Sequence, residues 1–475
     1  MKARLQKLLV LTLAALMLLS CFVACGVDGD SSETTASSVE NTTNEEGETQ
    51  YDPGIGTKNY DAEFNITGVY YIRDWATATD EQRGDPLYDT IYERSVKIQE
   101  QLGVTLVDVD AGDWLAYSTA VKRTVASGDN AYQLVATHCY QGVTDLLTAN
   151  VSYDFAEFDS VNLDAPYWAS SFMEEVKVGD EYLIGYNDFC LSVVIAFVFN
   201  KSLMEEYNLT APYEDVRNQT WTMDKLISLT STVAKDNGDG VWDGKDTYGL
   251  TGWGWADTIS FVSACDIKIV DRDETGLYQV AYGFNTEKTY AALQKVNKLY
   301  NAESTYFCGP LGTNVNFAEG TALMSTVDTT YLSTLRGTNF NFGVLPYPKY
   351  DEKQESYKSL NWNGVILVPS TNKASEDMVG DVLELLAYYT PPVKTAFYED
   401  LLGSKIADAP EDAEMLDVIW GSVVTDIGMV SANLSGMDPL LYMFPNLCMT
   451  DITGFSSYIQ KNSRSANKAL DRLYG

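Results

Sequence analysis

The sequence has a single histidine, His138, and no two cysteines in CxxC spacing. Histidine-based zinc sites need two or three imidazoles, so this class of metal site is excluded. A Ser-His-Asp triad could be built only around His138. Cysteine spacing gives no zinc ribbon, thioredoxin motif or iron–sulfur signature. The seven cysteines, of which we expect the last five to be mostly buried thiols with room for one incidental disulfide, are Cys21, Cys25, Cys139, Cys190, Cys265, Cys308 and Cys448.

Basic residues are also scarce, with 32 Lys and Arg against 67 Asp and Glu, which gives a formal charge of −35. A surface this acidic repels phosphate backbones and anionic lipid. We therefore expect no nucleic-acid partner, no electrostatic attachment to a membrane and no recognition of a polyanion. Neutral or cationic small molecules remain as ligands.

Sequence signatures of catalysis are missing too. There is no nucleophile elbow, P-loop or dinucleotide fingerprint, and Gly252-Trp253-Gly254 lacks a third glycine and, as we read it, a strand-to-helix context. Because 67 carboxylates guarantee that some pair lies near any ligand site, paired acids are no evidence for a glycosidase. We expect that the chain is not an enzyme. The enzymatic alternative is a lipid-anchored polysaccharide hydrolase or lyase.

The first 24 residues indicate export. Three basic residues precede an apolar run at 8–19 that is too short for a stable membrane span, as is typical of a signal peptide. Two cysteines at its end have contexts that resemble the bacterial lipobox, in which a cysteine is diacylated and becomes the new N-terminus. We favour Cys25, since Gly26 and a polar segment follow it, and Cys21 is the alternative.

Residues 25–54 are rich in Ser, Thr, Glu, Asp, Asn and Gly and have almost no large apolar side chain, so burial cannot offset the entropy of ordering. We expect a disordered tether there and a globular part that begins near Tyr60. The lipid anchor alone would then hold the protein at the extracellular face of the bacterial cell membrane.

Length and periodicity predict an α/β protein of two or three domains. The pattern is clearest at 86–102, where Asp85 is the expected N-cap and Gly103 the terminator of a helix. Strands at 64–71, 104–109 and 132–137 alternate with that helix and another at 113–127, which implies a largely parallel sheet. Residues 192–199 (SVVIAFVF) are almost without polarity, as in a strand covered on both faces. Further helices are expected from 222 and 286 and at 375–389, 411–424 and 455–473, with strands at 323–327, 342–346 and 364–368.

Five short segments carry a resemblance, and they occur in the order 211–226 (APYEDVRNQTWTMDKL), 236–250 (DNGDGVWDGKDTYGL), 317–324 (FAEGTALM), 342–350 (FGVLPYPKY) and 398–426, which contains AEMLDVIW. They resemble the extracellular solute-binding proteins of carbohydrate ABC importers, in the maltose-binding-protein-like superfamily, and in particular its Gram-positive lipoproteins. Together with the lipobox and tether, these segments span most of the chain.

This resemblance implies a two-lobe periplasmic-binding-protein-like fold of type II, with a ligand cleft between lobes joined by crossing strands. The first lobe would comprise 55–195 and 346–395, and the second 196–345 and 396–475, with crossings at 192–199 and 342–346. The implied function is reversible capture of a neutral mono- or oligosaccharide by a monomer that delivers it to the permease subunits. A binding lipoprotein for peptides or another nutrient is the alternative.

Candidate ligand residues are those in loops that follow strands, where α/β lobes bind ligands. Sugars are held by aromatic faces together with carboxylates, amides and backbone groups. His138 and Tyr140 follow the strand at 132–137 and resemble a family position that contributes polar contacts, although a histidine that only packs in the lobe is the alternative. The candidate aromatic faces are Trp253, Trp255, Tyr331 and Trp362, and the candidate carboxylates are Asp188 and Asp328.

The acidic loop at 236–246 resembles the calcium loops found in some of these proteins. With Gly240 as the sixth-position glycine, the metal ligands would be Asn237, Asp239, Asp243 and Asp246. The first position is then Lys235, so the loop is one residue short. A structural calcium ion is the one cofactor considered, and a solvated acidic turn is the alternative.

Overall fold

The computed structural model describes residues 42–43, 49–112, 115–191, 193–281, 286–307, 315–362, 364–402, 410–448 and 450–475. Residues 41–475 form one compact unit, apart from residues 1–40. The predicted signal peptide, the lipidation residues Cys25 and Cys21 and most of the tether therefore lie outside the described residues.

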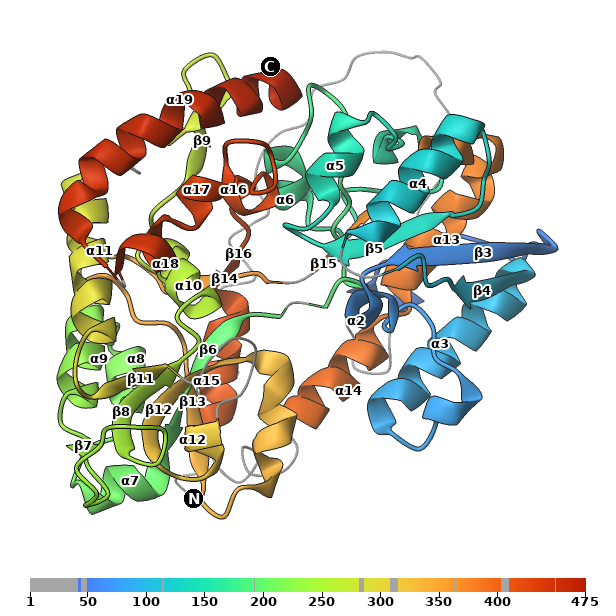
Figure 1. Ribbon diagram of the computed structural model, residues 1–475. Helices are drawn as coiled ribbons and strands as arrows, with labels where there is room; N and C mark the ends of the chain where they lie inside the picture. The colour runs from blue at the N-terminus through green and yellow to red at the C-terminus, as the bar shows by residue number, and fades with distance from the viewer. Residues whose placement is uncertain are drawn as a thin grey trace, which may run out of the picture. The chain divides into compact units, whose positions relative to one another are not determined.

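The first sheet has the strand order β15-β5-β3-β4 (Figure 1). Strands β3 (Ala62–Gly68), β4 (Val104–Asp108) and β5 (Leu134–His138) are parallel, whereas β15 (Gly364–Leu367) runs antiparallel to β5. The sheet is therefore mixed rather than parallel throughout, because its last strand comes from a distant part of the chain. The register pairs Gly364 with His138 at the end of β5.

Helix α3 (Pro86–Leu102) illustrates how local sequence fixes the first lobe. The carboxylate of Asp85 accepts hydrogen bonds from the backbone N–H groups of Leu87 and Tyr88, and Gly103 ends the helix in the left-handed conformation. Helices α13 (Glu376–Tyr388) and α14 (Pro391–Leu402) pack against α3. The other α-helices of this lobe are α2 (Tyr70–Arg73), α4 (Ala116–Ser127), α5 (Val143–Thr148) and α6 (Ser170–Glu175).

The second sheet has the strand order β11-β8-β12-β6-β13, with β7 (Ala234–Lys235) paired to β8. Strands β8 (Thr247–Gly252), β11 (Thr305–Phe307) and β12 (Ala322–Asp328) are parallel. Strand β6 (Ile195–Asn200) runs antiparallel to both its neighbours, β12 and β13 (Phe342–Leu345). Every residue of β6 is buried, which confirms the prediction of a strand covered on both faces.

Helices surround this second sheet, and a hairpin of β9 (Val270–Arg272) and β10 (Tyr278–Val280) lies against the last helix. The α-helices that follow β6 along the chain, apart from those of the first lobe, are α7 (Lys201–Glu206), α8 (Tyr213–Arg217), α9 (Met223–Thr230), α10 (Ala256–Ala264), α11 (Glu287–Tyr300), α12 (Val315–Ala318), α15 (Pro410–Gly421), α16 (Ile427–Val430), α17 (Asp438–Leu441), α18 (Met443–Cys448) and α19 (Phe455–Tyr474).

Two passages of the chain between the sheets run beside each other. Gly185 pairs with Ile366 of β15, and Val194, next to β6, pairs with Asn361. The short strands β14 (Ser359–Leu360) and β16 (Val423–Val424) form a parallel pair next to them. The return to the first sheet thus comes later along the chain than the predicted 342–346, because β13 at those positions is an edge strand of the second sheet.

The packed part of the chain begins at Tyr51, before the expected start near Tyr60. The Tyr51 hydroxyl accepts a 2.7 Å hydrogen bond from Asn162 Nδ2, and its ring centroid lies 5.6 Å from that of Tyr167. Further back, β1 (Thr42–Thr43) and β2 (Thr49–Gln50) pair antiparallel within the predicted tether.

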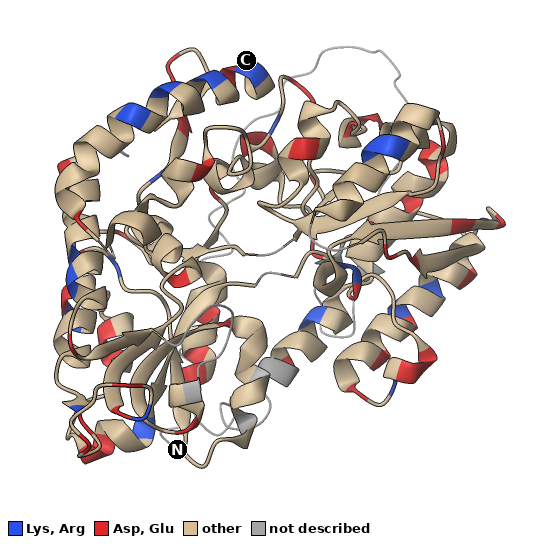
Figure 2. Cartoon of the chain, viewed as in Figure 1, with Lys and Arg blue, Asp and Glu red and all other residues tan. Residues whose placement is uncertain are grey.

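Cys139, Cys190, Cys265 and Cys448 are buried and unpaired, which confirms the prediction of buried thiols for these four; Cys308 lies outside the described residues. Across the described ranges, no helix combines the length and apolar character needed to cross a membrane. Acidic residues are spread over the elements of both sheets, whereas α19 carries a run of basic residues (Figure 2).

Candidate functional site

The carboxyl end of β5 brings three predicted ligand residues together. Because Gly364 pairs with His138, the chain just before β15 places Trp362 beside the histidine. The ring centroids of His138 and Trp362 are 6.1 Å apart, and Tyr140 lies 4.9 Å from His138 and 6.3 Å from Trp362. All three side chains are at least nine-tenths buried.

The histidine is neutral in this environment. Burial lowers the pKa of His138 to about 3, and a hydrogen bond with the Trp362 backbone opposes that shift only in part. Its Nδ1 accepts a 3.3 Å hydrogen bond from the Tyr140 backbone N–H, so the ring proton is on Nε2. His138 is therefore uncharged, and its ring is held by hydrogen bonds with the backbones of Tyr140 and Trp362.

The second lobe contributes the loop that carries Trp253 and Trp255. This loop joins β8 to α10, so the expectation that the Gly252-Trp253-Gly254 motif lacks a strand-to-helix context is wrong. Gly254 has φ +76°, and a Cβ atom there would lie 2.9 Å from the ring of Phe307. Glycine is required at this position because the φ angle is positive and because a Cβ atom would be too close to Phe307.

Asp257, in the first turn of α10, holds this loop in shape. Its Oδ2 accepts hydrogen bonds from the backbone N–H groups of Trp253 and Gly254 at 3.0 and 3.2 Å and from the Tyr300 hydroxyl at 2.6 Å. The carboxylate is fully buried, and burial raises its pKa, which the hydrogen bonds from Tyr300 and the Gly254 N–H oppose only in part. The position of Trp255 thus depends on a carboxylate that lies behind the loop.

Trp255 connects the two lobes. Its ring centroid lies 5.7 Å from Trp362 and 6.3 Å from Tyr140, and it stacks on Tyr442 at 5.9 Å with an interplanar angle of 23°. The chain that precedes Tyr442 also contacts the first lobe, since Asn433 Nδ2 donates a hydrogen bond to the Tyr140 backbone carbonyl. We call His138, Tyr140, Trp255, Trp362, Tyr442 and Tyr71 the interlobe aromatic cluster; the centroid of Tyr71 lies 6.4 Å from His138.

Asp328 and Tyr331, at the end of β12, lie near the same cluster. Burial raises the pKa of Asp328 to about 6, although the hydroxyl and backbone N–H of Thr330 donate to the carboxylate and oppose the shift. Burial raises the pKa of both Tyr71 and Tyr331, and the charge of Asp328 adds to the shift of each. Tyr331 and Tyr70, which is next to Tyr71, are 40% and 59% exposed and offer accessible faces.

Two predicted ligand residues are not brought into the interlobe aromatic cluster by any described contact. Asp188 Oδ1 accepts a 2.9 Å hydrogen bond from Lys394 Nζ on α14, and the pair forms an ion pair in the first lobe. Trp253 is half-buried, and its indole nitrogen has no hydrogen-bond partner among the described residues. Their role as ligand contacts stays a prediction.

The acidic loop uses its carboxylates to hold its own backbone. Asp246 is fully buried, and its two oxygens accept hydrogen bonds from the N–H groups of Asn237 at 2.8 Å and Asp243 at 2.6 Å. Asp239 and Asp243 likewise accept from residues two positions later. Within the described ranges, no group of three or more His, Cys, Asp or Glu side chains is arranged to hold a metal ion. This geometry favours the acidic turn over the calcium loop.

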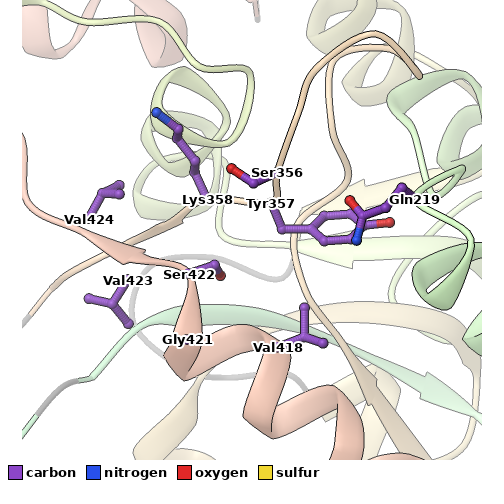
Figure 3. A pocket seen from close by; sticks show the side chains of 9 residues that line it. All are labelled: Gln219, Ser356, Tyr357, Lys358, Val418, Gly421, Ser422, Val423 and Val424. Carbon is purple, nitrogen blue, oxygen red and sulfur yellow. The ribbon is translucent and has the colours of Figure 1, made fainter. Parts of the chain in front are cut away.

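Two surface pockets of about 390 Å³ each lie at other places. One opens beside β14 and β16 and is lined by Lys358, Ser422 and their neighbours (Figure 3). The other lies between α3 and the start of α14, where Arg94 and Tyr389 line it. Neither pocket is lined by a residue of the interlobe aromatic cluster.

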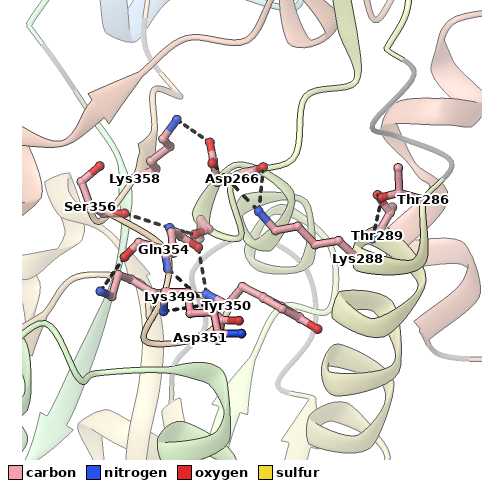
Figure 4. A network of polar contacts seen from close by, with 12 residues as sticks. Asp266, Thr286, Lys288, Thr289, Lys349, Tyr350, Asp351, Gln354, Ser356 and Lys358 are labelled. Atoms are coloured by element: carbon pink, nitrogen blue, oxygen red, sulfur yellow. Dashed lines mark hydrogen bonds and ion pairs between the residues drawn. The ribbon is translucent and has the colours of Figure 1, made fainter.

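A polar network fixes the chain before β14 to the second lobe (Figure 4). Lys358 Nζ pairs with Asp266, just beyond the end of α10, at 2.5 Å. Gln354 Nε2 donates to the Ala264 carbonyl at 2.8 Å, and the buried Lys349 donates to the Gln354 carbonyl at 2.7 Å. Helix α10 therefore links Trp255, at its start, to the chain that leads into the crossing.

Three comparisons with known proteins complete the description. No protein-family model matches the sequence, and no curated protein matches it. Solved structures do match: an ABC substrate-binding protein from Listeria monocytogenes in complex with cycloalternan has a TM-score of 0.57 at 11% identity, over 86% of this chain and 99% of that chain. The GacH receptor of Streptomyces glaucescens, solved unliganded and with acarbose, has a TM-score of 0.56 at 12% identity, over 86% and 98%.

UgpB from Mycobacterium tuberculosis, in complex with glycerophosphocholine, has a TM-score of 0.56 at 14% identity, over 86% of this chain and 98% of that one. The first of these structures is described as a substrate-binding protein and the second as a receptor. The chain thus has the two-lobe α/β fold of the substrate-binding proteins of ABC importers, which confirms the fold implied by the sequence resemblance.

Sequence reasoning missed several residues that now lie at the site. Tyr442 and Asn433 are in a segment of short helices far along the chain, where no local pattern indicates contact with Trp255 or Tyr140. Asp257 could have been found, because an acid in the first turn after a glycine-containing loop is typical of a residue that accepts backbone N–H groups.

Proposed function

We propose that this chain is the substrate-binding lipoprotein of an ABC importer, which reversibly binds a neutral mono- or oligosaccharide and delivers it to the permease. The observation that carries the proposal is the interlobe aromatic cluster, in which Trp255 of the second lobe meets Tyr140 and Trp362 of the first. Rings supplied by both lobes at one place allow a ligand to stabilise one arrangement of the lobes over another.

The chemistry of these residues suits a neutral, hydroxyl-rich ligand. Sugars present C–H faces that pack on aromatic rings, and hydroxyl groups that need hydrogen-bond partners. Asp328 lies near the rings as an acceptor, neutral His138 adds no charge, and Tyr331 and Tyr70 offer hydroxyls at an exposed position.

The cellular setting belongs to the same proposal. A signal peptide at residues 1–24, acylation at Cys25 or Cys21 and a tether up to residue 50 would hold the two lobes at the extracellular face of the membrane. Intact-mass analysis of the membrane-derived protein should give a chain that starts at one of these cysteines with acyl mass added. An unacylated chain cut elsewhere would remove the lipid anchor from the proposal.

One specific observation favours a second candidate ligand. Aromatic rings close to a carboxylate also bind quaternary ammonium groups, because the ring faces attract cations. The cluster and Asp328 have this composition, and UgpB, with the same fold, was solved with glycerophosphocholine. A choline-type solute is therefore the alternative nutrient.

A thermal-shift screen tests the proposal directly. The purified protein is heated with neutral mono- and oligosaccharides, short peptides and glycerophosphocholine. A ligand at 100 times its dissociation constant adds about 2.7 kcal/mol to stability, which is a readable shift. A saccharide hit supports the proposal, whereas a hit only for glycerophosphocholine or peptides replaces the sugar with that ligand class.

A matched pair of variants then connects the hit to the cluster. Trp255→Ala removes a half-buried ring from the cluster and should weaken binding about fivefold or more, since a stacked ring contributes on the order of 1 kcal/mol. Trp242→Ala removes the same side chain from an exposed loop position of the second lobe and should leave affinity unchanged. The same mixtures should contain unaltered sugar after hours of incubation. Cleavage that a single carboxylate substitution abolishes would favour the enzyme instead.

A further inference from the structure

Helix α19 (Phe455–Tyr474) is amphipathic and ends the chain. Its apolar face, which includes Ile459, Ala466 and Leu470, is buried against α17 and β10. Asn467 Oδ1 accepts the Val280 backbone N–H at 2.6 Å, and the Tyr474 and Ser431 hydroxyls lie 3.2 Å apart. These contacts fix which face of the helix points away from the protein.

The outward face is basic. Lys461, Arg464, Lys468 and Arg472 are all exposed. At 3.6 residues per turn they fall within about 80° of one another and extend for about 16 Å along the helix. The only acidic residue on α19 is Asp471 at its end. We call these four residues the basic stripe.

The basic stripe is unusual in a chain whose formal charge is −35. None of its four cations forms an ion pair with any described carboxylate, although many other Lys and Arg residues of the chain do. Figure 2 shows the same contrast, with α19 marked in blue while acidic residues are spread over the other elements. Local packing does not account for four unpaired cations on one helix face.

We propose that the basic stripe docks on the anionic headgroups of the bilayer to which the protein is tethered, and so orients the lobes at the membrane. This rests on the lipid anchor of the proposed function. At physiological ionic strength charges are screened over about 8 Å, so acids elsewhere on the chain scarcely weaken the contact of the stripe with phosphate groups. The net charge still prevents other faces from docking, which makes the contact directional.

The composition of the face favours a lipid surface over a protein partner. Protein interfaces take most of their binding energy from buried aromatic and apolar anchors. No large apolar side chain that is exposed in the described part of the chain lies on α19. A straight row of cations without an apolar anchor suits a fluid array of phosphates, which can rearrange beneath it.

Lysine acetylation on vesicles tests the proposal at the level of single side chains. Residues 26–475, which contain the compact unit at 41–475, carry an N-terminal histidine tag that replaces the acyl anchor on nickel-chelating vesicles. Acetylation of Lys461 and Lys468 should slow at least threefold on vesicles that contain phosphatidylglycerol, compared with phosphatidylcholine alone. High salt should restore the rate. The exposed Lys235 and Lys353 serve as internal controls and should react equally on both.

A charge-matched pair of variants completes the experiment. Lys461→Gln, Arg464→Gln, Lys468→Gln and Arg472→Gln are combined in one variant, which should lose the binding of the untethered protein to phosphatidylglycerol vesicles at physiological ionic strength. The control combines Arg123→Gln, Lys235→Gln, Lys353→Gln and Lys373→Gln, which are exposed positions on other elements, and should keep that binding. Circular dichroism confirms that both variants fold.

The results of these two assays decide whether the basic stripe binds the membrane surface. Equal acetylation rates on the two kinds of vesicle, or equal loss of binding in both variants, overturns the proposal. Slower acetylation only on membranes that contain the permease would also overturn it, in favour of a protein partner. Because neither assay uses a sugar or an acyl chain, a failed sugar screen or an unacylated N-terminus is distinguishable from failure of the stripe.

Discussion

The indole nitrogen of Trp362 donates a 3.0 Å hydrogen bond to the hydroxyl of Ser260, so the passage into the first lobe is joined to α10 of the second. Trp362 is 6% exposed, and rings of the interlobe aromatic cluster surround it. A tryptophan that was predicted to offer its face to a ligand therefore also fastens the two lobes together. A ligand that displaces this ring from Ser260 would break that hydrogen bond.

We expect Trp362→Phe to lower the free energy of unfolding by about 1 kcal/mol, since it removes a buried hydrogen bond and a little packing. Ser260→Ala should cost a similar amount, and the double variant should cost less than the sum of both. Trp420→Phe is the matched control, because the Trp420 indole nitrogen is buried without a partner among the described residues. Urea denaturation of the four variants checks this. Strict additivity of the Trp362 and Ser260 changes would contradict the coupling.

Asp257→Asn should weaken ligand binding without a change in any residue that touches the ligand. Asp257 Oδ2 accepts from Trp253, Gly254 and Tyr300, and Oδ1 accepts from the Thr258 N–H at 3.0 Å, so the NH2 group of an asparagine would face a hydrogen-bond donor whichever way the amide lies. We expect the loop that carries Trp255 to shift and affinity for the screened ligand to fall severalfold. Titration calorimetry gives the affinity.

The control for this prediction is Asp451→Asn, which changes an exposed carboxylate that accepts the Thr453 N–H at the start of a short helix. It should leave ligand affinity unaltered. Tyr300→Phe removes only the hydroxyl donor and should give an intermediate effect. If Asp257→Asn bound ligand as tightly as the unmodified protein, the loop would not depend on this carboxylate.

Local sequence was sufficient to predict where α3 and β6 lie along the chain, but it did not predict which strands pair with each other. Asp85 and Gly103 identified α3 to the residue, and the apolar run at 192–199 identified β6, because caps and burial patterns act within a few positions. The return crossing was misplaced, since nothing in residues 342–346 indicates which sheet the strand joins. Only the pairing of β13 with β6 decides that.

Part of the candidate site could be proposed from local sequence, and the ligand roles of its residues stay predictions. His138, Tyr140, Trp255 and Trp362 could be proposed because each lies next to the end of a strand. Asp188 could not be assessed, because the lysine that pairs with it lies 206 positions away. The stacking of Tyr442 on Trp255 likewise depends on long-range packing of a segment without strong periodicity.

Stability should depend on pH through Asp328. Burial raises its pKa to about 6, whereas an unfolded aspartate titrates near about 3.9. Between these values the folded chain binds more protons, so the stability from this group is present below about pH 4 and is lost as the pH rises through about 6. At about 1.36 kcal/mol per pKa unit, the contribution of this group is about 3 kcal/mol.

Asp328→Asn removes this titration while the amide oxygen can still accept from Thr330. The unmodified protein should therefore lose stability relative to the variant as the pH rises from 4 to 6, and the difference should stay constant above about pH 7. All other titrating groups are common to both proteins and cancel. Urea denaturation at pH 4, 5, 6 and 7 measures the difference; one that does not change with pH would mean that Asp328 titrates normally in the folded chain.

The last prediction concerns the acidic loop, where a structural role and a metal role give opposite results. Asp246→Ala should destabilise the protein by about 2 kcal/mol, because the N–H groups of Asn237 and Asp243 lose a fully buried acceptor. Asp239→Ala should cost less than about 1 kcal/mol, since that carboxylate is exposed and accepts only from Val241.

As an acidic turn, the loop should give the same melting temperature in chelator and in millimolar calcium. A calcium ion bound through Asn237, Asp239, Asp243 and Asp246 would instead raise the melting temperature, and both variants would abolish the rise. Differential scanning calorimetry of the three proteins under the two conditions decides between the two.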